Sequence, residues 1–150
     1  MSMLSETEKN YLIEQMRMLQ NIITRMNSNS FQLKGWMITI VAAFLALFCN
    51  SGEPVYIFIA ASMPVFFWML DSYYLVQERK YRGKYKIVEE VFNGKISREN
   101  FTFFDLSTND IPFEERYCFF SAMFSKTEAG LYVSVIVVLL LAGYITMILC

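Results

Sequence analysis

Three long apolar segments alternate with charged stretches along this 150-residue chain. The segments run from Leu33 to Cys49, from Val55 to Val76 and from Ala129 to Leu149. Each is close to the roughly 17–25 residues with which a helix crosses the hydrocarbon layer of a bilayer. The pattern therefore predicts an all-α membrane protein with three transmembrane helices. A hydrophobic content of 55% agrees with this class and is high for a soluble domain of this length.

The basic residues are distributed asymmetrically around these segments. All 13 Lys and Arg residues lie on one side of them, and the short connection at residues 50–53 carries no positive charge. Basic residues close to membrane spans are retained in the cytoplasm. We therefore expect a multi-pass protein of the cell membrane, with its N-terminus in the cytoplasm and its C-terminus outside.

This topology divides the chain into four parts. They are a cytoplasmic amphipathic helix at residues 1–30, a transmembrane hairpin at 31–76, a helical cytoplasmic juxtamembrane insert at 77–127, and a third transmembrane helix at 128–150. Pro64 is tolerated in a membrane helix, and from Gln77 onward no proline precedes Gly94, so we expect one long helix from Val55 to about Phe92. Within the remaining insert we expect a short helix at 97–104 and an amphipathic segment at 112–124.

Two capping boxes are expected to begin helices. One is Ser5 with Glu8, and the other is Ser125 with Glu128 at the start of the third span.

After the first capping box, apolar residues recur at alternating spacings of four and three, as in a coiled-coil seam. They are Leu12, Met16, Leu19, Ile23 and Met26. This seam either joins protomers or packs on the insert of its own chain. The polar stretch at 27–30 is either a joint or part of one continuous helix.

The residues that most enzymes need are scarce. The chain has no histidine, which removes the usual base for a nucleophile and the commonest zinc ligand. No glycine-rich phosphate loop is present. We expect neither enzymatic activity nor a bound metal or cofactor. Cys49 and Cys150 would both lie at the outer face, and we expect them to remain unpaired thiols rather than to form a disulfide.

A few polar residues fall within or beside the membrane spans. Asp71 lies in the inner part of span two, where a charge is costly and usually marks either an ion pair or a pathway. Lys34 enters span one at a similar depth, so an ion pair between the two would fix the hairpin. We group Thr39, Tyr74 and Glu78 with them as candidates for an intramembrane polar pair or a pore. Small residues on spans one and two also favour close helix contacts between protomers.

Five basic residues follow span two within eight positions. They are Arg79, Lys80, Arg82, Lys84 and Lys86, with Tyr81 and Tyr85 among them. One interpretation is contact with anionic lipid headgroups. The other is a ligand-binding site for a phosphate-bearing molecule, with the tyrosine rings available to stack on bases. Spacings of three and four also place Glu78 and Arg82 on one helical face, where they can pair.

Three runs of the sequence resemble a group of small bacterial membrane proteins. They are residues 26–36 (MNSNSFQLKGW) with Thr39 and Val41–Ala43, residues 71–82 (DSYYLVQERKYR), and residues 124–127 (FSKT). Similar small multi-span proteins, of the SLATT type or the membrane component of Hailong systems, are effectors of antiphage defence. The resemblance is one of architecture, and it carries over no ligand-binding residue.

The resemblance implies a homo-oligomeric channel or membrane-disrupting effector in the bacterial inner membrane. Its expected partners are the lipid bilayer, further copies of the chain in a tetramer or similar assembly, a nucleotide or oligonucleotide ligand, and the enzyme that makes this ligand. Three spans cannot enclose a water path alone, so a channel requires an oligomer. The alternative is a non-conducting membrane scaffold that recruits a cytoplasmic partner.

Overall fold

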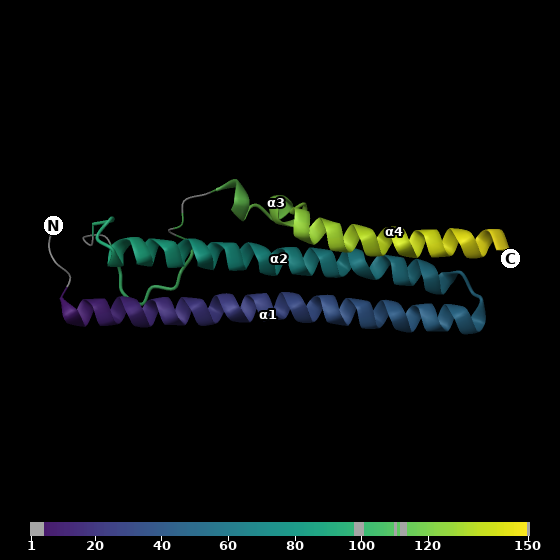
Figure 1. The fold of residues 1–150 in the computed structure, drawn as a ribbon, viewed down its shortest axis with the longest axis horizontal. Coiled ribbons are helices and arrows are strands. Elements are labelled where there is room, and N and C mark those ends of the chain that lie inside the picture. The colour runs from purple at the N-terminus through teal and green to yellow at the C-terminus, as the bar shows by residue number, and fades with distance from the viewer. Residues whose placement is uncertain (1–4, 98–100, 110, 112–113, 150) are drawn as a thin grey trace.

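The computed structural model describes residues 5–97, 101–109, 111 and 114–149, and these ranges contain helices and turns but no strand. Three helices are long and apolar enough to cross a membrane, as the sequence predicts. They are α1 (Glu6–Ser51), α2 (Val55–Phe92) and α4 (Lys126–Leu149). A short 3-10 turn, η2 (Glu115–Tyr117), and α3 (Phe119–Met123) precede α4. Figure 1 shows α1 and α2 side by side along their lengths, with α4 against one half of α2.

Helix α1 begins at the predicted capping box. The backbone N–H of Ser5 donates to Glu8 Oε2 at 2.8 Å, and the N–H of Glu8 donates to Ser5 Oγ at 3.4 Å. The helix then continues unbroken through residues 27–30, so the polar stretch belongs to one continuous helix. It ends at Ser51 and is capped by Gly52, whose φ of 71° suits a residue without a Cβ. The N–H of Gly52 donates to Phe48 O at 2.8 Å.

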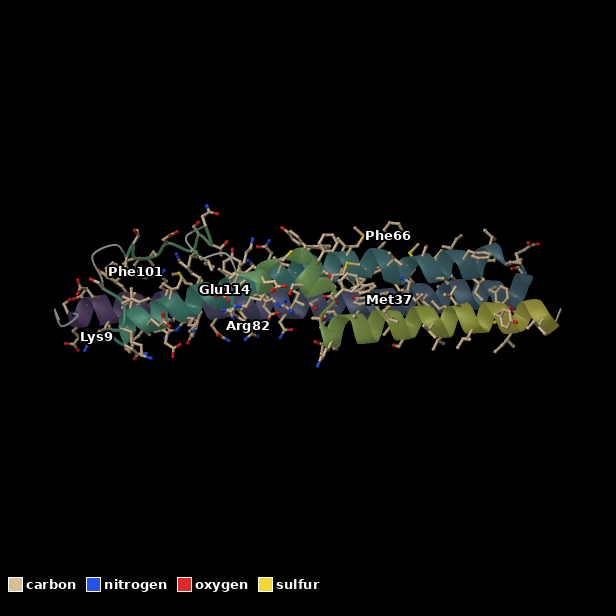
Figure 2. The ribbon with its side chains drawn as sticks, turned by 90° about the horizontal axis from the view of Figure 1, so that it is seen from above. Lys9, Met37, Phe66, Arg82, Phe101 and Glu114 are labelled. Atoms are coloured by element: carbon tan, nitrogen blue, oxygen red, sulfur yellow. The ribbon has the colours of Figure 1, made fainter. Side chains whose placement is uncertain are left out.

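Helix α2 forms the expected hairpin with α1. It starts directly after Pro54 and runs for 38 residues through Pro64, which it accommodates without a break. The boundary expected between residues 76 and 77 is therefore a change of polarity within one helix. The charged halves of α1 and α2 share one end of the molecule, which we call the basic end. The opposite end, which contains the turn at Gly52, is called the turn end. We call the half of the molecule that leads to it the apolar half, and Figure 2 shows mostly carbon atoms there, around Phe66 and Met37.

Two separate apolar clusters hold the helices together. In the apolar half, the buried members are Met37, Val41, Ala60, Trp68, Tyr132 and Leu139. Near the basic end they are Leu12, Leu19, Val88 and Val91. The N-terminal seam thus packs on α2 of its own chain, which was one of the two expected arrangements. A helix pair this long is stabilised by such burial at both ends rather than by helix propensity alone.

The segment before α4 differs from the sequence-based expectation in three places. The predicted helix at 97–104 is wrong for its described residues, since Ser97 and residues 101–104 are not helical. The predicted amphipathic segment at 112–124 is divided, within residues 114–124, into η2 and α3. The second capping box does not form, because Ser125 Oγ is buried without a hydrogen-bond partner. Glu128 instead contacts Lys34, an ion pair that a local capping rule does not consider.

Candidate functional site

A polar cluster connects all three long helices where the apolar half begins. Lys34 on α1 places its Nζ 2.6 Å from Asp71 Oδ2 on α2 and 3.2 Å from the carboxylate of Glu128 on α4. The same Nζ donates to Ser30 Oγ at 2.9 Å, one turn earlier on α1. Tyr132, one turn after Glu128, donates its hydroxyl to Asp71 Oδ2 at 2.9 Å. We call these five residues the three-helix cluster.

Burial makes the ion pairs of this cluster important for the fold. The side chain of Asp71 is 0% exposed, whereas that of Lys34 is 20% exposed. A buried ion pair adds little net stability compared with apolar residues, but removal of one partner leaves a charge that water cannot solvate. The cluster therefore fixes how α1, α2 and α4 meet.

The Lys34–Asp71 pair expected from the sequence is present within one protomer. Because Asp71 is enclosed between helices, it does not line an outer surface of the protomer. Glu128 and Tyr132 were not among the sequence-based candidates, although both contribute to the same cluster. The available signal was their spacing of four residues, which places a carboxylate and a hydroxyl on one face of the third span.

A second feature is a stripe of small and polar side chains on α1, which faces away from α2 and α4. Its members recur at spacings of three and four and are all exposed. They are Ser28, Gln32, Gly35, Thr39, Ala42, Ala46 and Asn50. We call this set the outer stripe. Thr39 donates its hydroxyl to Gly35 O at 3.0 Å, and a Cβ added to Gly35 would meet no atom within 4 Å.

The remaining exposed surfaces of the three spans are dominated by large apolar side chains, which on α1 include Phe31, Trp36 and Ile38 beside the outer stripe. On α2 they carry large apolar side chains such as Phe58 and Phe66, and on α4 they carry Val138, Leu141 and Ile148. Large aliphatic and aromatic groups suit contact with lipid chains, whereas small residues allow helix backbones to approach each other. The outer stripe is therefore the part of the described spans best suited to contact another protomer.

The basic segment of α2 is less uniform than its sequence indicates. The carboxylate of Glu78 pairs with Arg82 at 2.7 Å, as the spacing predicts. Arg79 donates to Arg116 O at 2.9 Å, and Lys86 lies 3.9 Å from Glu90. Such exposed pairs are weak, so these cations remain available to an anionic ligand.

Lys84 differs from its neighbours because it points inward. Its side chain is 2% exposed, and its Nζ lies 3.2 Å from Asp105 Oδ2. Lys84 is therefore buried and paired in this structure, and its predicted role as a ligand-binding residue stays a prediction. Tyr81 and Tyr85 also pack against the apolar cluster near the basic end, which leaves their rings less available for stacking on bases. Tyr74 is half-buried, and its ring meets the Tyr73 ring edge-on at 5.9 Å.

Residues 101–109 form a loop that crosses from α2 to α1 at the basic end, and we call it the crossing loop (Figure 1). The buried Gln15 on α1 holds this loop through both side-chain atoms. Its Nε2 donates to Asp105 O at 2.9 Å, and its Oε1 accepts from Phe104 N at 3.2 Å. Phe104 has a φ of 59°, which is uncommon for a residue with a side chain. Lys84 and Gln15 together explain why this conformation is retained.

Acid should release the crossing loop. The Ser107 backbone N–H and the Lys84 ammonium lower the pKa of Asp105 below its usual value. The resulting stabilisation is complete above the unfolded value of about 3.9 and is lost as the pH falls through the lower folded value. We expect hydrogen-exchange protection in residues 101–109, corrected for intrinsic exchange rates, to fall in that range. Asp105→Asn should remove this pH dependence, and an unchanged acid response in that variant would contradict the assignment.

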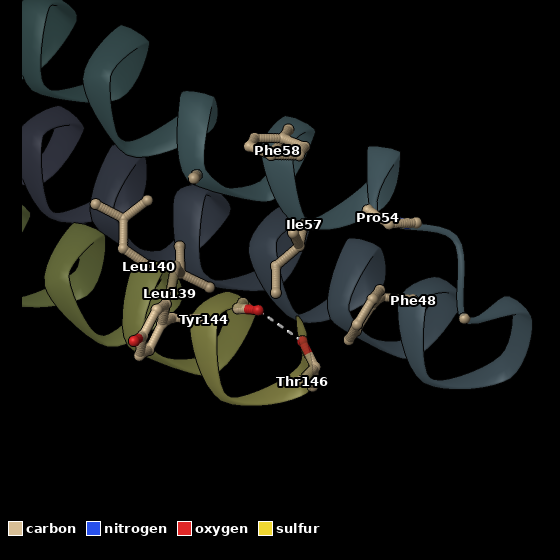
Figure 3. Close-up of a pocket in the computed structure, with 11 residues that line it drawn as sticks. Phe48, Pro54, Ile57, Phe58, Leu139, Leu140, Tyr144 and Thr146 are labelled. Atoms are coloured by element: carbon tan, nitrogen blue, oxygen red, sulfur yellow. Dashed lines mark hydrogen bonds between the residues drawn. The ribbon is translucent and has the colours of Figure 1, made fainter. Parts of the chain in front are cut away.

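An apolar pocket of about 300 Å³ lies at the turn end, lined by the end of α1, the turn, α2 and α4. Phe58 and Ile57 from α2 and Tyr144 from α4 are among its lining residues, as Figure 3 shows. Thr146 contributes a hydroxyl that already donates to Gly143 O at 2.9 Å. The pocket therefore offers an apolar surface and few polar groups that would select a ligand.

Comparisons with known proteins leave the function to be argued from this geometry. No family model, curated protein or solved structure matches the chain. The resemblance to antiphage effectors therefore stays a prediction. The structure supports the coarser conclusion that this is an all-helical protein of the multi-pass membrane class.

Proposed function

We propose that the chain assembles into a homo-oligomeric membrane channel, a tetramer or an assembly of similar size, with the outer stripe of α1 around the central axis. The observation that carries this proposal is the contrast between the outer stripe and the large apolar surfaces of α2 and α4. Within the span the outer stripe consists of Gly35, Thr39, Ala42 and Ala46, whose small size allows helix backbones to approach each other, and the polar Gln32 and Asn50 flank it. The spacing of three and four residues also suits packing between parallel α1 helices.

The proposal also includes the orientation of the protein in the membrane and the kind of molecule that controls it. The one-sided distribution of Lys and Arg supports a cytoplasmic basic end in a bacterial inner membrane. An anionic signal of the nucleotide type would then meet Arg79, Lys80, Arg82 and Lys86, repeated around the axis by each protomer. Convergent cations raise the local concentration of an anion, and its binding weakens with salt. Lys84 has no part in this step because it is committed to Asp105.

A biological role follows from the resemblance. We propose an effector of antiphage defence that acts when an infection-induced enzyme supplies the signal. The outer stripe supports assembly and conduction, and it gives no information about the trigger. Production of the protein together with a candidate nucleotide synthase would test this part separately, with loss of membrane potential as the measurement.

The conduction path can be tested by cysteine accessibility. In a background with Cys49→Ser, Cys118→Ser and Cys150→Ser, we expect Thr39→Cys channels in planar bilayers to lose most of their current when a charged, water-soluble thiol reagent is added. The reagent should reach position 39 through water and add bulk there. Val138→Cys on α4 is the matched control, because its exposed side chain would face lipid.

Three outcomes would contradict the channel. They are block at position 138 without block at position 39, a detergent-solubilised protein that stays monomeric at all concentrations, and stable oligomers that never conduct. The last of these would favour the non-conducting scaffold. In that case the outer stripe would be a helix-packing surface alone.

A further inference from the structure

The three-helix cluster contains more negative than positive charge. Two carboxyl groups, on Asp71 and Glu128, share the single ammonium of Lys34. The remaining two members, Ser30 and Tyr132, contribute neutral hydroxyls. Two carboxylates that share a site from which water is largely excluded do not both ionise without a large cost. One negative charge in this cluster therefore needs a further partner.

The hydrogen bonds of the cluster indicate what this partner is. An ammonium has three N–H donors. The Nζ of Lys34 contacts oxygens of Ser30, Asp71 and Glu128, which uses all three. Asp71 Oδ1 is buried and has no hydrogen-bond donor, and Glu128 Oε2 is buried with only the Lys34 ammonium beside it, at 3.2 Å. Both carboxylates contact the same Lys34 Nζ, at 2.6 Å for Asp71 and 3.2 Å for Glu128, so the two groups lie near each other. A hydrogen bond between two carboxyl groups needs a proton on one of them.

We propose that the three-helix cluster is a proton-binding site in which Asp71 and Glu128 together hold one proton. Uptake converts one carboxylate and one hydronium ion to a carboxylic acid and water. The acid then donates to the other carboxylate, and Lys34 neutralises the remaining charge. A 20% exposed Lys34 side chain and a 10% exposed Glu128 side chain give water a route to the site.

Proton binding has a mechanical consequence because the two carboxyl groups lie on different helices. With the proton bound, α4 is joined to the hairpin through a hydrogen bond and the ion pairs. After its loss, Asp71 and Glu128 repel each other across one ammonium, which loosens the first turns of α4. Low pH therefore favours the closed contact and high pH the loosened one. The charged groups that set this balance are Lys34 on α1, Asp71 on α2 and Glu128 on α4, with the Tyr132 phenol beside them.

Infrared difference spectroscopy on the full chain in lipid vesicles tests this site directly. We expect the carbonyl stretch of one protonated carboxyl group, shifted in D₂O, which disappears as the pH is raised. Glu128→Gln and Asp71→Asn should each abolish this band, because either change leaves one carboxylate for one ammonium. Glu53→Gln, at an exposed position of the turn, is the matched control and should retain the band.

Hydrogen exchange gives the corresponding mechanical measurement. Corrected protection of the amides at 126–132 should fall at high pH in the unmodified chain and stay constant in Glu128→Gln. The proposal is overturned if the unmodified chain lacks the band at every pH, or if the band survives both cluster variants. It is also overturned if added sodium ions abolish the band at constant pH, because sodium would then occupy the site in place of the proton. None of these measurements depends on conduction, so a protein that conducts nothing would still test the site.

Discussion

Lys34→Met should destabilise the folded protomer by about 3–5 kcal/mol, the usual cost of removing one partner from a buried ion pair. The substitution removes the ammonium that contacts Asp71 at 2.6 Å and Glu128 at 3.2 Å. The carboxyl groups then lose their positive partner in a place where water does not replace it. Titration with a denaturing detergent, followed by circular dichroism, measures the free energy of unfolding.

Two further variants separate this effect from the mere loss of a long side chain. Lys126→Met is the matched control, because Lys126 begins α4 and is exposed; we expect a change within about 0.5 kcal/mol. Adding Asp71→Asn and Glu128→Gln to Lys34→Met should recover much of the lost stability, since no unpaired charge remains. Equal effects of Lys34→Met and Lys126→Met would show that the cluster does not hold the helices together.

Features that depend on periodicity could be predicted from the sequence. The three spans, the continuation of α2 to Phe92 and the Glu78–Arg82 pair all follow from local spacing and apolar runs. The Lys34–Asp71 contact could also be predicted. A tight turn makes the first two spans antiparallel, so residues at similar depths in the membrane lie next to each other. In each case the partner is fixed by helix geometry or by a short connection.

Contacts set by long connections could not be predicted in this way. Glu128 lies 94 residues from Lys34, and its local context matches a capping box better than an ion pair. Lys84 has the same local surroundings as Lys80 and Lys86, yet only Lys84 faces Asp105 in the crossing loop. That loop has neither helical nor strand periodicity, so its path depends on Gln15 and on packing against two helices. The sequence therefore indicated a basic segment but not which of its cations are free to bind.

Trp68→Ala should be the most damaging single apolar substitution in the apolar half of the protein. Trp68 is 8% exposed, stacks on the ring of Tyr132 with centroids 6.0 Å apart, and meets Phe124 edge-on at 5.7 Å. Its Nε1 also donates to Met123 O at 2.9 Å, which attaches the end of α3 to α2. Removal of this side chain therefore deletes contacts that join α2 both to α3 and to α4.

We expect Trp68→Ala to lower the free energy of unfolding by about 3–5 kcal/mol, as for other buried aromatic residues. The only other tryptophan supplies the control, because Trp36 is 59% exposed on α1 and Trp36→Ala should change protomer stability by about 0.5 kcal/mol or less. Detergent titration followed by circular dichroism measures both variants. Limited proteolysis should also cut Trp68→Ala faster between η2 and α4, since α3 loses its hydrogen bond to α2. If the two variants unfold alike, or if the junction stays protected in Trp68→Ala, then α3 is held by other contacts and Trp68 does not couple the insert to the membrane spans.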